Sequence, residues 1–318
     1  MFATNLPCSA VSLQNITFTN DWSLHPWESQ TISDNLLQSF NRIGIIHKPI
    51  LLTKENGTFD ILCGYKRLLF TLTKAQMRNI DCLILPQKTQ PTLLLDILLT
   101  DQCSARPLSL VEKAQFVEIS SRFLADQDII DNYFERLQLR KKLSVINDLK
   151  NILQFDPFII AEIHSDMLQE KMVGELLRLQ GIPDRLALVR LFKGLALGEG
   201  KQKRFFTLIR DISFRLGCTI SAYLRTQEID QILKHPELNI PQKIQHLKDL
   251  LQQQLNPLHS QAEDKFTKQV RDLQLPSHFT ITHSPSFERD TVTLSIVCKS
   301  LSDCADLVSK INHFSQDR

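Results

Sequence analysis

Glycine is scarce in this chain, with 9 among 318 residues, and leucine-rich stretches and 18 phenylalanines are spread along the sequence. Tight turns and bulges need glycine because they use backbone conformations that other residues rarely adopt. A chain with few glycines and many leucines is therefore expected to be mostly helical. Hydrophobic residues make up 42% and charged residues 23%, close to the globular average, which excludes disordered and collagen-like classes.

The hydrophobic pattern changes along the chain and predicts four regions. Residues 1–90 mix helix and strand signals and predict an α+β domain. Residues 91–240 indicate an all-α region. Residues 241–276 predict an amphipathic antiparallel helical pair that turns at Asn256 and Pro257, and alternation with period two followed by a helix from Ser302 predicts a small ββα module over 277–318.

Local signals place the elements of the first region. Ser33 is expected to cap a helix that stops at Gly44, and 45–52 indicates a buried strand, with Pro49 at an edge or bulge. The Asn56-Gly57 pair predicts a two-residue hairpin leading into a strand over 59–62. A helix over 66–77 and a strand over 80–85 complete the unit.

A capping box opens the helical region. Ser109 and Glu112 have the spacing at which a serine hydroxyl and a glutamate carboxylate satisfy the first free N–H groups of a helix. The apolar residues that follow at helical spacing, Val111, Phe116, Ile119 and Phe123, are predicted to pack into a core.

The end of the strand at Cys63-Gly64 is a candidate phosphate site. Lys66 and Arg67 follow at the start of a helix, where unpaired N–H groups and the helix dipole favour anions. By the residues alone, two solvated cations are an equally good interpretation.

Two segments resemble the ParB family of chromosome and plasmid partition proteins. Cys-Gly-Tyr-Lys-Arg over 63–67 is similar to that family's Gly-Glu-Arg-Arg motif, with Tyr65 in place of the acidic residue and Lys66 in place of an arginine. The run DQCSARPLSLVEKA over 101–114 resembles the family's second motif, with Gln102 in place of an asparagine and Arg106 displaced by one position. The likeness covers roughly residues 36–206.

This resemblance implies a ParB-like N-terminal α+β domain, a helix-turn-helix region and a nucleotide triphosphate pocket, typically for CTP with Mg²⁺. Binding in that family switches a dimer between open and closed forms on DNA. The implied nucleotide-binding residues of this chain are Gly64, Tyr65, Lys66, Arg67, Asp101, Gln102 and Arg106. Gly64 would allow close backbone approach, Lys66 and Arg67 would meet phosphates, and the last three would form a second wall.

Residues 125–153 are a candidate helix-turn-helix. Ile129, Ile130 and Phe134 would pack its first helix, and Leu143, Ile146 and Leu149 its second. The exposed residues offered to DNA would be Arg140, Lys141, Lys142, Asn147 and Lys150. Acidic residues lie close by, so a structural three-helix core is the alternative.

A basic block extends from Arg185 to Arg215. Its eight cations face two acidic residues, whereas the whole chain, with 37 basic and 35 acidic residues, has a net charge of only +2. Such a block would add salt-sensitive affinity for phosphates, or it could simply be a solvated face. Its phenylalanines, 192, 205, 206 and 214, are more typical of a core.

The cysteines and histidines predict no metal site. Seven scattered cysteines without a C-x-x-C pair are typical of reduced thiols in a cytoplasmic protein, and Cys63 is expected to be buried at its strand end. Nine histidines are dispersed and show no ligand pair. We also expect no signal peptide and no membrane span, because no basic flank precedes an apolar stretch and no apolar run is long enough.

The leading hypothesis is a ParB-like DNA-binding protein, switched by a nucleotide and acting in partition or transcriptional regulation. We expect a homodimer through the C-terminal module, because an exposed two-stranded sheet carrying Ile281, Leu294 and Ile296 needs a partner surface. A protein-interaction or scaffold protein that has lost nucleotide switching is the alternative. An enzyme acting on nucleotides at Gly64, at most a slow triphosphatase, is a third hypothesis.

Overall fold

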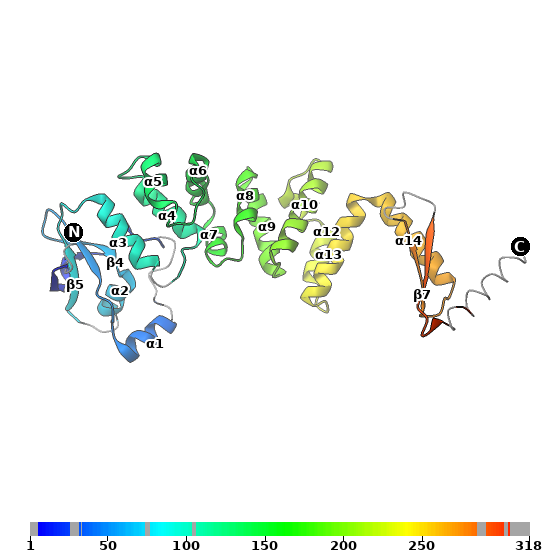
Figure 1. Ribbon diagram of the computed structural model, residues 1–318, viewed down its shortest axis with the longest axis horizontal. Helices are drawn as coiled ribbons and strands as arrows, with labels where there is room; N and C mark the ends of the chain where they lie inside the picture. The colour runs from blue at the N-terminus through cyan, green and yellow to red at the C-terminus, as the bar shows by residue number, and fades with distance from the viewer. Residues whose placement is uncertain are drawn as a thin grey trace, which may run out of the picture. The chain divides into compact units, whose positions relative to one another are not determined.

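The computed structural model describes residues 6–25, 32, 34–73, 77–103, 106–284, 291–301 and 305. The fold is mixed, with many helices and small sheets (Figure 1). It divides into two compact units, one up to Lys203 and one from Arg204 onward. The expected helical excess is therefore present.

Five strands of the first unit form one sheet. They are β1 (Cys8–Ser12), β2 (Ile16–Thr17), β3 (Ile50–Thr53), β4 (Phe59–Cys63) and β5 (Asn79–Leu85), in the order β1-β5-β3-β4-β2. The pairs β1–β5 and β3–β4 are antiparallel, and β3–β5 and β2–β4 are parallel. The sequence did not predict β1, β2 or the 3-10 turn between them (Leu13–Asn15).

The predicted hairpin is present, but its loop is longer than expected. Thr53 pairs with Phe59, so five residues connect β3 and β4, and Gly57 has a φ of 78°. The predicted strand over 45–52 is wrong in its first half. Strand β3 starts only at Ile50, directly after Pro49, because proline has no N–H to donate to a sheet.

Two helices belong to this sheet domain. Helix α1 (Asp34–Ile43) ends at Gly44, whose φ of 73° is the left-handed conformation expected at a helix stop. The proposed cap Ser33 lies outside the described residues. Helix α2 (Tyr65–Thr73) begins one residue before the predicted start and ends before Met77. Its Leu68 packs with Leu51, Ile61 and Cys82 in the core of the sheet.

Seven further helices fill the first unit: α3 (Pro91–Cys103), α4 (Leu110–Ser120), α5 (Asp126–Tyr133), α6 (Leu143–Ile152), α7 (Pro157–His164), α8 (Glu170–Arg178) and α9 (Ile182–Gly194). Helix α4 packs against α6 and α7, and α3 packs against β4. The capping box at Ser109 and Glu112 is confirmed. Phe123 is not in the core as predicted, since it is 43% exposed and stacks on Trp22.

The second unit contains most of α10 (Glu199–Arg215), followed by α11 (Ile220–Tyr223), α12 (Gln227–Lys234), α13 (Ile240–Leu255), α14 (Pro257–Asp272), β6 (Phe279–His283) and β7 (Val292–Ile296). The predicted helices α13 and α14 are present and meet at Asn256. Strands β6 and β7 pair antiparallel as predicted, and the helix expected from Ser302 falls largely outside the described residues.

Among the helices of the described residues, none has both the length and the apolar character needed to cross a membrane.

Candidate nucleotide site and nucleic-acid interface

A cavity of about 420 Å³ lies beside the N-terminus of α2. Its walls come from the chain before α1, from α1 and the segment that follows it, from the β4–α2 junction and from α3. The residues predicted for a nucleotide site that line it are Gly64, Tyr65, Lys66, Arg67 and Gln102. One residue of the second motif is therefore brought to the same cavity as the first motif.

Gly64 makes the turn from β4 into α2 possible. Its φ of 93° is a conformation that residues with a side chain rarely adopt, and a Cβ there would lie 3.1 Å from the Cα and Cβ of Pro49. Glycine at this position thus serves both the turn and the close approach of another backbone segment.

The Arg67 side chain lies beside the turn between β4 and α2. It lies 3.7 Å from the carboxylate of Asp101 and donates long hydrogen bonds, 3.4 Å each, to the carbonyls of His47 and Lys48. Arg67 therefore ties α2 to α3 and to the segment before β3. Lys66 lines the same cavity and supplies a second positive charge.

Much of the cavity wall is apolar. Trp22, Phe40, Ile43 and Leu98 contribute side chains to it, and Tyr65 packs edge-on against Phe18 with ring centroids 5.9 Å apart. Partial burial raises the pKa of the Tyr65 phenol, so it stays protonated at neutral pH. No sequence pattern indicates Trp22 or the segment before it as part of a site, because these residues reach the cavity only through the fold.

The second motif is divided by the structure. Gln102 lines the cavity and Asp101 pairs with Arg67, but Arg106 is not among the residues that line it. Instead, Arg106 donates two hydrogen bonds to the buried carboxylate of Glu112, at 2.7 and 2.6 Å. Of the three residues expected to form a second wall, Gln102 therefore lines the cavity, and Asp101 and Arg106 do not.

Cys63, at the end of β4, is buried as predicted. Burial raises the pKa of its thiol well above the ordinary value, and the nearby Asp101 carboxylate raises it further. The thiolate that nucleophilic chemistry requires is thus disfavoured, which supports a structural role for Cys63.

Helices α5 and α6 occupy the segment proposed as a helix-turn-helix. Ile129, Ile130, Phe134, Ile146 and Leu149 are buried as predicted. Leu143 was expected to join them but is 55% exposed, because it begins α6 at the edge of the packed face. The connection runs from Phe134 to Lys142, longer than the three or four residues typical of this motif.

The residues proposed to contact DNA lie on this connection and on α6. Arg140, Lys141, Lys142 and Asn147 are exposed. Lys141 lies 3.5 Å from Glu135, and the half-buried Lys150 lies 3.4 Å from Asp126. Nearby acidic residues thus neutralise part of the positive surface.

Several cations of the basic block serve packing inside their own unit. Arg185 bonds to the carbonyl of Leu179 and lies over the Phe155 ring, and Lys193 pairs with Glu162 and lies over Phe158. Of the block's phenylalanines, 192, 205 and 206 are buried as expected, whereas Phe214 is 88% exposed.

The first unit therefore belongs to the class of proteins in which a sheet domain with a cavity at a helix N-terminus is followed by helices. Two solved structures to which the chain is similar are both of the C-terminally truncated chromosome-partitioning protein ParB from Caulobacter crescentus. The one complexed with CTP-gamma-S has a TM-score of 0.25 and 11% identity, covering 55% of this chain and 94% of that one. The one complexed to the centromeric parS site has a TM-score of 0.35 and 11% identity, covering 62% of this chain and 97% of that one.

TM-scores this low do not establish a common fold, so membership of the ParB family stays a prediction. A scan against protein-family models finds no match, and a search of curated proteins finds none either.

Proposed function

We propose that this chain is a ParB-like, cytoplasmic DNA-binding protein whose cavity beside α2 binds a nucleotide triphosphate, with CTP and Mg²⁺ as the first candidates. Its process would be chromosome or plasmid partition or transcriptional regulation. The observation that carries the proposal is the cavity itself, because it joins the start of a helix, two cations and an apolar wall in one place.

The chemistry of the cavity fits the parts of a nucleotide. The positive end of the α2 dipole, together with Lys66 and Arg67, suits phosphates. The side chains of Trp22, Phe40 and Tyr65 suit a flat base. A volume of about 420 Å³ lies within the range of small-molecule sites. The carboxylate of Asp101, 3.7 Å from Arg67, is an oxygen ligand that could help to hold Mg²⁺.

DNA binding is assigned to the surface around α5 and α6. Arg140 and Lys142 are exposed there, and Asn147 lies on the exposed side of α6. Guanidinium and ammonium groups would contact phosphates, and an asparagine amide can read a base edge. The homodimer through the C-terminal module is part of the same proposal, since Val292, Leu294 and Val297 expose 62%, 46% and 75% of their surface.

One observation favours the alternative of a scaffold protein without nucleotide switching. Arg67 already has an internal anion in Asp101 and two internal carbonyl acceptors. A cation that is tied in this way can act as a structural link between α2 and α3 rather than as a phosphate ligand.

Calorimetric titration of the full chain with CTP, ATP and GTP, with and without Mg²⁺, decides between the two. We expect saturable binding of at least one triphosphate, weakened roughly tenfold or more in Lys66→Gln, because a charge-assisted hydrogen bond contributes about 1.5–3 kcal/mol. Lys88→Gln is the matched control, since Lys88 is exposed on the same domain and does not line the cavity.

Absence of binding by every triphosphate would reject the switch and favour the scaffold. Equal loss in both lysine variants would indicate a nonspecific charge effect and would also reject this site.

A further inference from the structure

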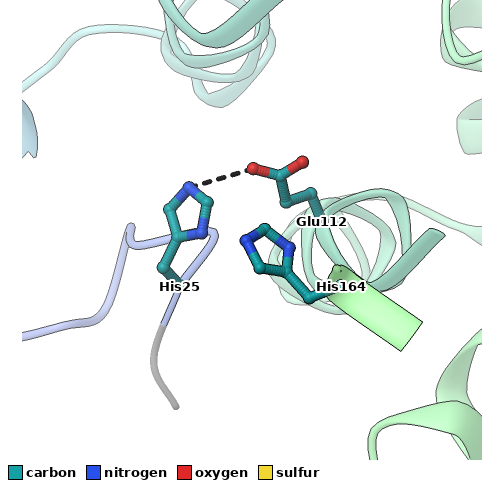
Figure 2. A group of neighbouring side chains, drawn as sticks. All are labelled: His25, Glu112 and His164. Atoms are coloured by element: carbon teal, nitrogen blue, oxygen red, sulfur yellow. Dashed lines mark ion pairs between the residues drawn. The ribbon is translucent and has the colours of Figure 1, made fainter. Parts of the chain in front are cut away.

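A polar cluster surrounds the buried carboxylate of Glu112, to which the motif residue Arg106 also donates. His25 comes from the segment before α1, Glu112 from the first turn of α4, and His164 ends α7. One potential ligand atom from each of the three lies within 4.8 Å of the others (Figure 2). The rings of His25 and His164 meet edge to face with centroids 5.3 Å apart. Residues far apart in the sequence thus converge on one point.

The carboxylate of Glu112 is held as an anion. Its side chain is 1% exposed, and it receives hydrogen bonds from Arg106 and from the Ser109 N–H, while His25 Nε2 lies 3.0 Å from Oε1. Burial alone raises the pKa of Glu112. The hydrogen bonds from His25, Arg106 and Ser109 outweigh that effect and bring the pKa well below its ordinary value.

The surroundings also orient the side chain of His164. Ser109 Oγ lies 2.9 Å from Nδ1 of His164, which fixes that ring at one nitrogen. Metal-binding histidines and carboxylates in proteins are usually held in this way by hydrogen bonds to their remaining polar atoms.

We infer that His25, Glu112 and His164 form a site for a divalent transition metal, with Zn²⁺ as the best match. Two imidazoles and one carboxylate are a known zinc ligand set that leaves a fourth position for water. The ion takes Nε2 of His25, Oε1 of Glu112 and Nε2 of His164. The ring hydrogen of His25 then resides on Nδ1. The Ser109 N–H keeps its hydrogen bond to Oε2 and supports the carboxylate, whereas Arg106 gives up its hydrogen bond to Oε1.

Arg106 is the feature that opposes the ion, since its charge lies beside the ligating carboxylate. Its side chain is 50% exposed and can turn towards solvent. The alternative is a hydrogen-bonded cluster without a metal, in which Arg106 and His25 neutralise the charge of Glu112. The two possibilities make opposite predictions for a variant without the Arg106 charge.

The site would join three parts of the first unit. His25 also lines the cavity beside α2, whereas Glu112 and His164 belong to helices of the bundle that includes α6. A bound ion would therefore link the cavity wall to α4 and α7. It would also raise the melting temperature of the full chain.

The test is titration of full-length, chelator-treated protein with Zn²⁺ and with Co²⁺, whose visible absorption reports four-coordinate geometry. Binding of one ion per chain is expected, with a loss of affinity of about 100-fold or more in His25→Gln and His164→Gln. His246→Gln is the control because His246 is exposed on α13, and Mg²⁺ is the control ion because it prefers oxygen ligands.

Arg106→Gln separates the two possibilities and still decides if a histidine variant fails to fold. A metal site predicts tighter Zn²⁺ binding in Arg106→Gln, because a competing charge is gone. Unchanged or weaker binding in that variant overturns the inference. So does Zn²⁺ binding that His164→Gln leaves intact, or a Co²⁺ spectrum dominated by thiolate bands, which would place the ion at cysteines.

Discussion

The cavity beside α2 and the surface around α5 and α6 use their cations in different ways. At the cavity, Arg67 is mostly buried, and its partners Asp101 and the His47 and Lys48 carbonyls lie within the same small space. On the α5–α6 connection, Arg140 and Lys142 are exposed, and Lys141 has only a loose contact with an exposed Glu135.

The difference shows that the number of cations does not determine the strength of a site. Charges interact several times more strongly where water is partly excluded than on an exposed surface, which salt also screens. Under the proposed function, we therefore expect tight binding of a small anion at the cavity and weaker, salt-dependent contact with an extended polyanion at the α5–α6 surface.

Thiol labelling should show the largest contrast between the two regions. Cys63 is buried at the cavity, and burial raises the pKa of its thiol well above the ordinary value, whereas Cys103 is exposed beside Arg136 and burial raises the pKa of its thiol less. Only thiolates react with maleimides, so we expect Cys103 to react about 100-fold faster or more at pH 8. Mass spectrometry of labelled peptides measures both rates, and comparable rates would show that the cavity floor opens readily.

Arg67→Gln should weaken triphosphate binding by about 10- to 100-fold, because a charge-assisted contact in a partly dry site is lost. DNA affinity in the absence of nucleotide should change less than threefold. Calorimetry and fluorescence anisotropy measure the two affinities. An equal effect on both would remove the distinction between the regions.

Gly64→Ala should destabilise the fold by about 1–3 kcal/mol, since alanine at this φ is strained and its Cβ would press on Pro49. Urea unfolding measures this cost. Gly200→Ala is the control, because that glycine has no neighbour within 4 Å of an added Cβ. A cost below that of the control would mean that the β4–α2 turn relaxes freely.

Removing two exposed charges, in Lys141→Gln with Lys142→Gln, should weaken DNA binding about tenfold at moderate salt and lower the salt slope by about 2. The pair Lys265→Gln with Lys268→Gln, exposed on α14, makes the same charge change elsewhere. A salt slope that falls equally in both double variants would place DNA binding outside the α5–α6 surface.

Phe123→Leu should have the smallest effect. Its ring stacks on Trp22 at a centroid distance of 5.4 Å, beside a hydrogen bond from Arg122 to the Asp21 carbonyl, and such a ring pair contributes about 0.5–1.5 kcal/mol. Thermal melts should show the loss. If nucleotide affinity falls as well, the cavity wall depends on the contact of Trp22 with the segment that follows α4.

Features fixed by a few neighbouring residues could be predicted from the sequence. The Ser109–Glu112 cap, the hairpin at Gly57 and the stop at Gly44 are decided within one turn of chain, where local hydrogen bonding and glycine geometry dominate. Strands β1 and β2 could not be predicted, because they are short and are stabilised by pairing with residues far along the chain.

The same limit applies to the sites. The β4–α2 turn with Gly64, Lys66 and Arg67 is local and was predicted as part of the cavity. The motif resemblance places Arg106 at that site, but its side chain instead donates hydrogen bonds to the buried carboxylate of Glu112. His25 and His164 are about 140 residues apart, so no spacing rule could pair them.

The stacking of Trp22 on Phe123 also gives this protein a built-in optical probe. The chain has two tryptophans, and Trp22 both lines the cavity and stacks on Phe123, which follows α4. In a Trp27→Phe background, the emission wavelength and quenching of the remaining indole would report cavity filling and helix displacement in real time, without an attached dye.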